Sequence, residues 1–307
     1  MQRQRPEAVL IAGPTASGKS ALAIAVAEVL DGVVVNADSA QVYRDLSIIT
    51  ALPSAEDEAH VPHCLYGYRS AREPFSVADW LSDVGHLLDD LRRDQRPAII
   101  VGGTGLYFKA LTQGLAGVPE IPDDIRSHWR ERASELGSEA LHADLAARDP
   151  VMAERLRPSD TQRITRALEV IEATGRSLAD WQSDPPSSPL LRPDRMKAFV
   201  IEIDRALLHA RINQRFEHMV ALGALEEARA FAAIEIDPAM PAARAIGVRP
   251  LVAAALGTLS LSEAIERAQA ESRQYAKRQV TWLRHQMPDW HRIAFGASER
   301  ELKDLMV

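Results

Sequence analysis

The sequence feature that most restricts the fold is the stretch VLIAGPTASGKSALA, which spans Val9–Ala23. Gly13 is followed by four residues and then by Gly18-Lys19-Ser20, the G-x-x-x-x-G-K-[ST] pattern of a phosphate-binding loop, or P-loop. Such a loop connects a buried strand to the first turn of a helix, and the apolar run 9–12 and the helical segment 17–30 fit these two elements. The motif predicts a core that binds a polyphosphate, but it leaves the reaction open.

The chemistry of the loop follows from its backbone and two of its side chains. Successive N–H groups and the dipole of the following helix attract an anion, Lys19 adds a positive charge, and Ser20 can ligate Mg²⁺. A glycine-rich turn that holds no ligand is the structural alternative. We expect phosphates to lie against the eight loop residues Gly13, Pro14, Thr15, Ala16, Ser17, Gly18, Lys19 and Ser20.

Strand and helix patterns alternate after this loop. Buried strands are predicted at 32–39 and 98–101, and between them Ser76 and Asp79 form a capping box that opens an amphipathic helix. This alternation predicts a parallel sheet with right-handed crossovers and a site at the C-terminal ends of the strands. The fold class is therefore α/β, with a P-loop-containing parallel-sheet core, a helical insertion domain and a helical C-terminal region.

The character of the chain changes after the first half of this core. Residues 123–180 are polar and helix-periodic without a strand candidate, and 183–194 contain four prolines, which indicates a linker. The segment MKAFVIEID, at 196–204, predicts a strand that returns to the core sheet. We therefore expect three parts: the first part of the P-loop core at 1–120, a helical insertion at 121–195, and core completion with C-terminal helices at 196–307.

Composition restricts the compartment and the partners. The single cysteine, Cys64, excludes an internal disulfide and a cysteine-based zinc site, and it fits a reducing cytoplasm. We expect no signal peptide, because the N-terminal apolar run is too short, and no membrane span, because no run approaches ~18 apolar residues. The net charge of −7 argues against a nucleic-acid partner unless basic residues gather locally.

The acidic residue best placed for chemistry is Asp38. A P-loop ATPase needs an acid after a second strand to hold its metal, but the strand at 98–101 ends in Gly102-Gly103. Asp38 stands at the end of the other predicted strand, where it can take a proton from a nucleophile or merely cap the next helix. Thr104, directly after the glycine pair, can form a hydrogen bond in the same cleft or serve as a helix N-cap.

Basic residues gather in two helical segments. From Arg267 to Arg292, six Lys and Arg side chains stand against two acidic ones, which gives a local net charge of +4. A basic helix on an acidic protein suggests a phosphate-backbone partner, although a solvated helix face has the same composition. Arg163 and Arg166, in the segment DTQRITRALEV of the insertion, allow the same two interpretations.

Five segments in this order resemble the tRNA dimethylallyltransferase (tRNA isopentenyltransferase) family: GPTASGKS, NADSAQVY, VGGTGLYFKAL, DTQRITRALEV and QYAKRQVTWLR. The resemblance covers nearly the whole chain, from about Val9 to Trp290. It implies transfer of a dimethylallyl group from dimethylallyl diphosphate to N6 of the adenosine directly 3′ of the anticodon (A37). The implied substrates are tRNAs that read codons beginning with U, and the implied product is N6-(dimethylallyl)adenosine.

The resemblance also implies roles for individual residues. The P-loop and Arg244, in ARAIG, would hold the prenyl diphosphate, with Mg²⁺ near Ser20. Asp38 would be the general base that orients and deprotonates the adenine amine, with Thr104 beside it. The insertion would clamp the anticodon stem-loop. The positions at which the family contacts tRNA are Asp38, Ser39, Ala40, Gln41, Thr104, Arg126, Gln162, Arg163, Ile164, Thr165 and Arg166.

Two loops depart from the family pattern. The family commonly has I-G-T-A-K-P after the acid motif, whereas this chain has IITALP, in which Ile49 and Leu52 replace the glycine and the lysine. In the second loop, GVRP, Val248 stands where a tyrosine commonly follows the glycine. These differences concern the detailed substrate contacts of both loops rather than the reaction.

The chemistry of the motifs and the resemblance lead to the same mechanism. An anticodon loop is single-stranded, so a protein can unstack its adenine and reach the N6 amine. That amine attacks the allylic carbon, and diphosphate leaves towards the loop N–H groups, Lys19 and the metal. We therefore expect ATP to bind this loop at most as a weak competitor.

Two other functions fit part of the sequence. A P-loop small-molecule kinase of the shikimate-kinase type has a similar acid and glycine pair, but it needs neither the insertion nor the basic helix. A nucleotide-sensing RNA-binding module without catalysis would tolerate substitution of Asp38. For the transferase, we expect a cytoplasmic monomer whose partners are tRNA and dimethylallyl diphosphate, with no contact with a membrane.

Overall fold

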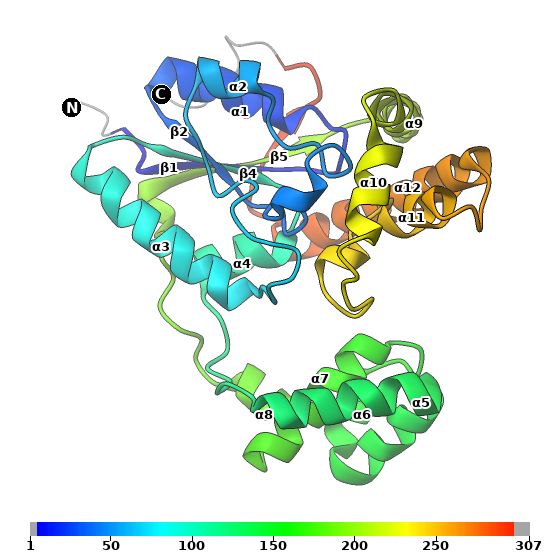
Figure 1. Ribbon diagram of the computed structural model, residues 1–307. Helices are drawn as coiled ribbons and strands as arrows, with labels where there is room; N and C mark the ends of the chain where they lie inside the picture. Colours follow the sequence, from blue (N-terminus) through cyan, green and yellow to red (C-terminus); the bar gives the residue numbers. More distant parts are fainter. Residues whose placement is uncertain (1–4, 298–307) are drawn as a thin grey trace. The chain divides into compact units, whose positions relative to one another are not determined.

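The protein is described here from a computed structural model, of which residues 5–297 are described, and it divides into two compact units (Figure 1). Among the described residues, one unit comprises 5–112 and 190–297, and the other comprises 113–189. The first unit holds a six-stranded sheet, and the second is built from helices. The chain therefore leaves the sheet-containing unit once and returns to it.

The sheet is parallel throughout and has the strand order β3-β2-β4-β1-β5-β6. Its strands are β1 (Ala8–Ala12), β2 (Val33–Asn36), β3 (His63–Cys64), β4 (Ala98–Gly102), β5 (Met196–Glu202) and β6 (His291–Ala294). The predicted return strand is confirmed, because β5 pairs with β1 from Ala8 opposite Met196 to Ala12 opposite Val200. The sequence analysis missed β6, a strand of four residues that pairs with β5 at the sheet edge.

Helices cover both faces of this sheet (Figure 1). Helices α1 (Lys19–Leu30) and α2 (Ala55–His60) lie over one face, and α3 (Val77–Arg93) and α4 (Gly105–Gln113) over the other. Leu10 of β1 belongs to the buried cluster of α3 and α4, whereas its neighbour Ile11 belongs to the cluster of α1. Alternate side chains are thus buried on opposite faces, which explains why the strands are continuous apolar runs.

The predicted capping box is present at the start of α3, with Ser76 and Asp79 bonded to each other's backbone N–H groups. One turn in, the fully buried Trp80 donates its indole N–H to the backbone oxygen of Asn36 at 2.9 Å. Its ring stacks on Tyr107 of α4, with 4.3 Å between the ring centroids. Helix α3 is thereby fixed to the end of β2, where the candidate site begins.

A second group of helices follows β5 in the same unit. It consists of α9 (Arg205–Ala221), α10 (Ala224–Ala232), α11 (Val248–Ala255) and α12 (Leu261–Gln286), with the short 3₁₀ helix η3 (Ala242–Arg244). Phe216, Phe231 and Leu251 are buried in the cluster that these helices share. Two residues that depart from the family pattern, Ile49 and Val248, are buried in the same cluster, so both act in packing.

Two predicted boundaries differ from the observed ones. The strand predicted at 32–39 ends at Asn36, because the Asn36 side chain bonds the backbone of Asp38 and turns the chain. The helix predicted from residue 17 begins at Lys19, because Gly18 adopts a left-handed conformation with φ 79°. In both places a side chain or a glycine in the loop decides where the regular element ends or begins.

The helical unit at 113–189 has its own core. It contains α5 (Asp123–Arg148), α6 (Pro150–Arg155), α7 (Thr161–Thr174) and α8 (Leu178–Ser183), and α5 is kinked at Gly137. Trp129, Leu141 and Leu168 are buried in its central cluster. Across both units, no helix within residues 5–297 has the length and apolar character needed to cross a bilayer.

Candidate active site

Three neighbouring strands bring the predicted catalytic residues to one edge of the sheet. The P-loop follows β1, Asp38 follows β2, and Thr104 follows β4, which lies between the other two. The backbone N–H of Ser39 donates to Thr104 Oγ1 at 2.9 Å, which joins the ends of β2 and β4. The site therefore lies at the C-terminal edge of the sheet, as expected for a parallel α/β fold.

Asp38 is held by the side chain of Asn36, which is fully buried. Asn36 Oδ1 accepts from the Asp38 N–H at 2.7 Å, and Asn36 Nδ2 donates to the Asp38 carbonyl at 3.0 Å. Within the described part of the chain, Asp38 Oδ1 accepts a local bond, from the Ala40 N–H at 3.1 Å. The next helical segment is the 3₁₀ helix η1 (Arg44–Leu46), so the alternative that Asp38 caps the next helix is wrong.

Thr104 directly precedes α4, and its hydroxyl accepts from the Ser39 N–H and donates to Ser39 Oγ at 3.3 Å, while Tyr275 of α12 lies close enough for Thr104 to influence its pKa. Burial and the nearby Asp38 carboxylate raise the pKa of Tyr275, which therefore stays a neutral phenol. Between these residues, Gly103 leaves no room for a side chain, because a Cβ there would clash with Gln279 and lie 3.4 Å from Asp38 Oδ2. The glycine pair thus allows α12 to approach Asp38.

The P-loop holds a buried cation. Lys19 is 8% exposed, and desolvation lowers the pKa of its amine from 10.5 to about 8, with Asp38 opposing this shift and Arg215 adding to it. The hydroxyl of Ser17 is also buried and has no hydrogen-bond partner among residues 5–297. A desolvated ammonium and an unpartnered buried hydroxyl in one loop are donors expected of an anion site.

Two residues of this site escaped the sequence analysis, because they lie far from the P-loop along the chain. Arg215 of α9 donates to Thr15 Oγ1 at 3.1 Å. Gln279 of α12 accepts from the Thr15 N–H at 2.9 Å and donates to the Gly103 carbonyl at 2.9 Å, so it bridges the P-loop and β4. Gln279 lies in the family motif QYAKRQVTWLR, so this motif could have identified it as a site residue. No local sequence pattern marks Arg215.

Arg215 adds a second cation to the loop. Desolvation lowers the pKa of its guanidinium, and the nearby Asp38 acts in the opposite direction. Arg215 and Lys19 repel each other, because Arg215 contributes to the lowered pKa of Lys19. A bound polyanion would relieve both the repulsion and the desolvation.

The remaining predicted tRNA and diphosphate contacts of the sheet-containing unit differ in whether their side chains are free to bind a substrate. Gln41 uses its amide within the protein, donating to the carbonyls of Thr50 and Ala51 at 3.0 and 2.6 Å. Ser39 and Ala40 lie in the turn that Asp38 forms. Arg244 is the last residue of η3 and is exposed.

In the helical unit, the predicted tRNA contacts divide into exposed and buried residues. Gln162 and Arg163 are exposed on α7, whereas Ile164 is fully buried and Thr165 is 9% exposed, so these two side chains serve the core. Arginines on this unit pair with acids one turn away: Arg126 with Asp123 at 3.7 Å, Arg163 with Asp160 at 3.5 Å, and Arg166 with Glu169 at 3.2 Å. Such local pairs contribute little to stability, so these cations can exchange them for phosphates.

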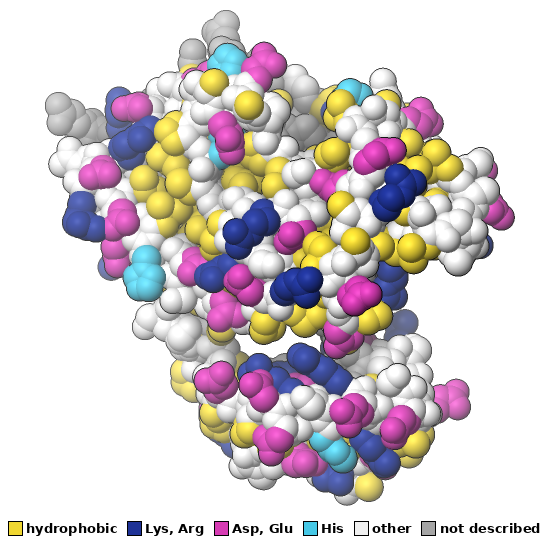
Figure 2. All heavy atoms as spheres, viewed as in Figure 1, with side chains coloured by type: hydrophobic (Ala, Val, Ile, Leu, Met, Phe, Trp, Pro, Cys, Tyr) yellow, Lys and Arg dark blue, Asp and Glu magenta, His cyan; other side chains and the backbone are white. Residues whose placement is uncertain are grey.

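Basic side chains also gather on the surface. Figure 2 shows Lys and Arg side chains along one edge of the helical unit, with acidic side chains beside them. On α12, Lys277, Arg278 and Arg284 are exposed, whereas Arg273 donates to Asn213 Oδ1 at 2.6 Å. The predicted basic helix therefore has an exposed cationic part and one arginine that links α12 to α9.

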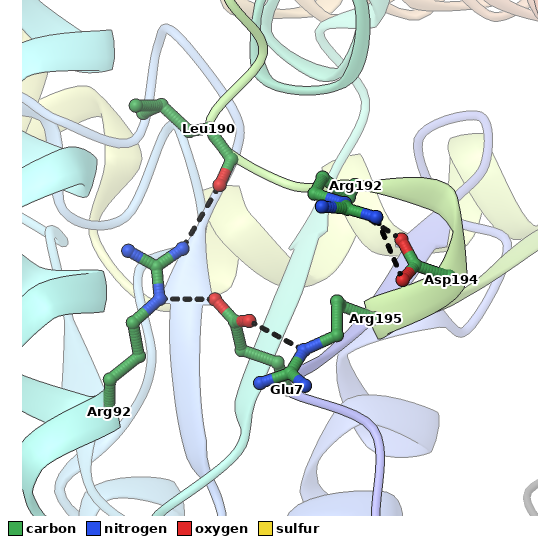
Figure 3. Close-up of a pocket in the computed structure, with 6 residues that line it drawn as sticks. All are labelled: Glu7, Arg92, Leu190, Arg192, Asp194 and Arg195. Atoms are coloured by element: carbon green, nitrogen blue, oxygen red, sulfur yellow. Dashed lines mark hydrogen bonds and ion pairs between the residues drawn. The ribbon is translucent and has the colours of Figure 1, made fainter.

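A separate cavity of about 250 Å³ lies away from this site (Figure 3). Glu7, which precedes β1, is paired there with Arg92 and Arg195, and Arg192 is paired with Asp194. Because Glu7 and Arg195 directly precede β1 and β5, the cavity lies at the N-terminal ends of these strands, opposite the P-loop. Its charges are paired with one another, which indicates a structural role.

The sequence matches two family profiles. One, described as IPP transferase, matches residues 41–286, and the other, described as isopentenyl transferase, matches residues 6–62. This chain belongs to the IPP transferase family. The resemblance drawn from the five motifs is thereby confirmed.

Curated relatives in this family carry one name. A tRNA dimethylallyltransferase of Nitrobacter hamburgensis is 52% identical over 296 residues, which cover 96% of this chain and 93% of the relative. A tRNA dimethylallyltransferase of Agrobacterium fabrum is 51% identical, with 94% of this chain and 97% of the relative covered. This IPP transferase is therefore a prenyltransferase, and the comparisons support this function rather than the kinase alternative.

Solved structures show the same fold. The full-length tRNA isopentenylpyrophosphate transferase of Bacillus halodurans aligns with a TM-score of 0.70 at 31% identity, over 98% of this chain and 95% of that one. A eukaryotic dimethylallyltransferase acting on tRNA aligns with a TM-score of 0.76 at 24% identity, over 97% of this chain and 75% of that one, and it supports the fold alone. The IPP transferase fold therefore includes both the sheet-containing unit and the helical unit.

Proposed function

We propose that this IPP transferase moves a dimethylallyl group from dimethylallyl diphosphate to N6 of the adenosine directly 3′ of the anticodon (A37). The proposed substrates are tRNAs that read codons beginning with U, and the products are N6-(dimethylallyl)adenosine and diphosphate. The relatives named tRNA dimethylallyltransferase, at about 50% identity over nearly the whole chain, support this assignment. We further propose that the enzyme acts in the cytoplasm as a monomer.

One observation carries the proposal: Lys19 of the P-loop and Arg215 of α9, which donates to Thr15 of that loop, lie within electrostatic reach of a single carboxylate, Asp38. Asp38 contributes to the pKa values of both Lys19 and Arg215. Lys19 and Arg215 can bind a diphosphate, and Asp38 can accept a proton next to it. A leaving group and a base are therefore brought together, as a displacement at the carbon attached to the diphosphate requires.

The reaction proceeds by attack of the N6 amine on the allylic carbon C1. The new C–N bond forms as the C1–O bond breaks, and the diphosphate carries away the bonding electrons. Asp38 takes the proton that the N6 amine loses, while Thr104 fixes the segment that carries Asp38 through its bond to Ser39. Negative charge that grows on the departing diphosphate is stabilised by Lys19, Arg215 and the loop N–H groups.

The site fits an Mg²⁺ ion that is coordinated jointly by protein groups and by the substrate phosphates. Within residues 5–297 there is no cluster of three or more His, Cys, Asp or Glu side chains that could hold a metal. Mg²⁺ commonly binds through one or two protein groups plus substrate phosphates, and exposed Ser20 and the unpartnered Ser17 hydroxyl offer such groups. When bound, Mg²⁺ would neutralise charge on the diphosphate.

The tRNA partner is proposed to contact both units. On the helical unit, Arg126, Gln162, Arg163 and Arg166 are the candidate contacts, and on the sheet-containing unit Ser39 and the exposed cations of α12 are available. A single-stranded anticodon loop suits such contacts, because its bases can be unstacked and presented to Asp38.

The test is prenylation of an anticodon stem-loop RNA with labelled dimethylallyl diphosphate and Mg²⁺ in nucleotide-free buffer. We expect labelled product in the absence of ATP, and only weak inhibition when ATP is added. An RNA that carries guanosine in place of the target adenosine is the matched control and should stay unlabelled. Product that forms only when ATP is supplied and hydrolysed would refute the proposal, and tRNA binding without any product would favour a non-catalytic RNA-binding protein.

A further inference from the structure

The segment after β6 brings an aromatic ring to the P-loop. Phe295 directly follows β6, and its N–H donates to the Glu202 carbonyl at 2.7 Å, which continues the pairing with β5. Its ring lies against Gly18, because a Cβ on that glycine would be 3.1 Å from Phe295 Cε2. Residue 295 lies beyond the matched part of the IPP transferase profile, which ends at 286. The contact thus comes from a part of the chain that the profile does not describe.

Arg211 of α9 links this ring to the tip of the loop. Its guanidinium carbon lies 4.6 Å from the centroid of the Phe295 ring, within the range of a cation–π contact. Its Nε donates to the Ala16 carbonyl at 2.9 Å. The ring therefore packs against the same guanidinium that bonds the backbone of the loop.

The loop needs such support because its backbone is strained. Ala16 has φ 62°, a left-handed conformation that is unfavourable for a residue with a Cβ, and Gly18 has φ 79°. A strained residue keeps its conformation only when its surroundings fix it. The methyl group of Ala16 packs in a small cluster with Leu208 and Ile212 of α9, so its support comes from the same helix as Arg211.

The conformation matters for binding, because left-handed residues in a loop turn successive N–H groups towards one anion. Relaxation of Ala16 would turn these groups away without removing any of them. The expected result is weaker binding of the phosphate group and weaker stabilisation of the departing diphosphate, while the base is kept, since Asp38 follows β2, a different strand.

We propose that Phe295 is a positioning residue of the diphosphate site, which acts with Arg211 to hold the P-loop in the conformation that receives the diphosphate. Its effect is exerted through the backbone of Ala16 and Gly18. The identity of the natural ligand rests on the proposed function, whereas the binding of inorganic diphosphate tests the loop by itself.

The experiment compares Phe295→Ala, Phe295→Leu and Phe295→Tyr with the wild type. The dissociation constant of inorganic diphosphate with Mg²⁺ is measured by calorimetry, and KM and kcat are measured with dimethylallyl diphosphate. Removal of the ring in the Ala and Leu variants should raise both the dissociation constant and KM by roughly two- to thirtyfold, the range of a cation–π contact. The Tyr variant keeps the ring and should behave as the wild type. In the Ala and Leu variants kcat should fall as well, because the loop N–H groups also stabilise the departing diphosphate, whereas tRNA affinity should not change.

The matched control is His291→Ala. His291 lies on β6, and its ring contacts Phe199 at 6.0 Å between centroids, so its removal takes a ring from the same strand pair without altering the P-loop contact. Diphosphate binding by this control should equal that of the wild type. A control that weakens binding as much as Phe295→Leu would overturn the proposal, because the effect would then come from the sheet edge.

Coupling with Arg211 gives a second test. If the two side chains act as a unit, Arg211→Lys should weaken diphosphate binding, and the double variant Arg211→Lys/Phe295→Leu should be little worse than either single variant. These two variants keep the proposal testable even if Phe295→Ala fails to fold. Fully additive losses, wild-type binding by Phe295→Leu, or an equal fall in kcat, tRNA affinity and melting temperature would overturn it.

Failure of the proposed prenyl transfer can be distinguished from failure of the positioning role of Phe295. A wild-type protein that binds inorganic diphosphate but does not prenylate RNA would refute the prenyl transfer, and the Phe295 variants would still decide the positioning role by calorimetry. A wild-type protein that prenylates RNA, with Phe295→Leu variants that bind diphosphate equally well, would refute the positioning role alone.

Discussion

Replacement of Lys19 by methionine should make the ligand-free protein more stable while it removes its affinity for diphosphate. Methionine is similar in length and apolar, so it occupies the buried space without a charge. Burial lowers the pKa of the Lys19 amine from 10.5 to about 8. At about 1.36 kcal/mol per pKa unit, this shift means that the buried ammonium destabilises the folded state by roughly 3 kcal/mol. By the usual scaling, the melting temperature of Lys19→Met should rise by roughly 6 °C at pH 7.

The pH dependence of this gain follows from linkage. The folded state loses the Lys19 proton at about pH 8, and the unfolded chain loses it near 10.5. Below pH 8 both states are charged, and the folded state bears the full cost of the buried ammonium. Between pH 8 and 10.5 the folded state releases its proton first, so the wild type gains stability and the advantage of Lys19→Met fades.

The assay is urea denaturation of the ligand-free wild type and variant at pH 7 and pH 10, together with calorimetry of inorganic diphosphate at pH 7. Lys277→Met, on the exposed part of α12, is the control and should change neither stability nor diphosphate affinity. If Lys19→Met is no more stable than the wild type at pH 7, or if its advantage is the same at both pH values, the buried Lys19 ammonium does not destabilise the folded state. Unchanged diphosphate affinity would remove Lys19 from the site.

Three further predictions concern the base, the RNA-binding arginines and the departures from the family pattern. Asp38→Asn should lower the single-turnover rate by ~10²–10⁴-fold while tRNA binding is kept, because it removes the proton acceptor and preserves the shape; full activity would exclude Asp38 as the base. Arg163→Ala/Arg166→Ala should weaken tRNA binding and reduce the slope of log K against log salt by ~0.7 for each single-strand phosphate that the variant no longer neutralises; an unchanged slope would assign both arginines to a solvated face. Ile49 and Val248 are 5% and 1% exposed in one buried cluster, so Val248→Tyr should destabilise by about 1–3 kcal/mol through overpacking. Combination with Ile49→Ala should cost less than the sum of the two single losses in urea denaturation, and strict additivity would show that the two positions do not share space.

The sequence by itself determined the local elements and the kind of chemistry. The spacing of Gly13, Lys19 and Ser20 predicts the P-loop, because its geometry depends on neighbouring backbone groups and on glycine conformations. The capping box at Ser76 and the apolar periodicity of α3 are likewise properties of a short stretch. Asp38 was found because an acid at the end of an apolar strand is a local signal.

Short-range sequence patterns predicted the bounds of elements less well where one side chain or one neighbouring strand sets those bounds. The early end of β2 depends on three hydrogen bonds of the Asn36 side chain, one of them to the carbonyl of Leu65, which lies 29 residues away. The strand β6 has four residues and becomes a strand because β5 offers a free edge. Neither feature has a periodic pattern long enough to be recognised in the sequence.

Only the tertiary structure decided which distant residues complete the site. Thr15 and Gln279 are 264 positions apart, and Thr15 and Arg215 are 200 apart, yet each pair is joined by a hydrogen bond. Ring contacts such as that of Phe295 with Arg211 arise in the same way, from the position of β6 beside β5 and of α9 over the P-loop. Sequence periodicity specifies which face of an element is buried, but not which element covers it. That choice follows from the strand order and the packing of α9 and α12, which depend on the whole chain at once.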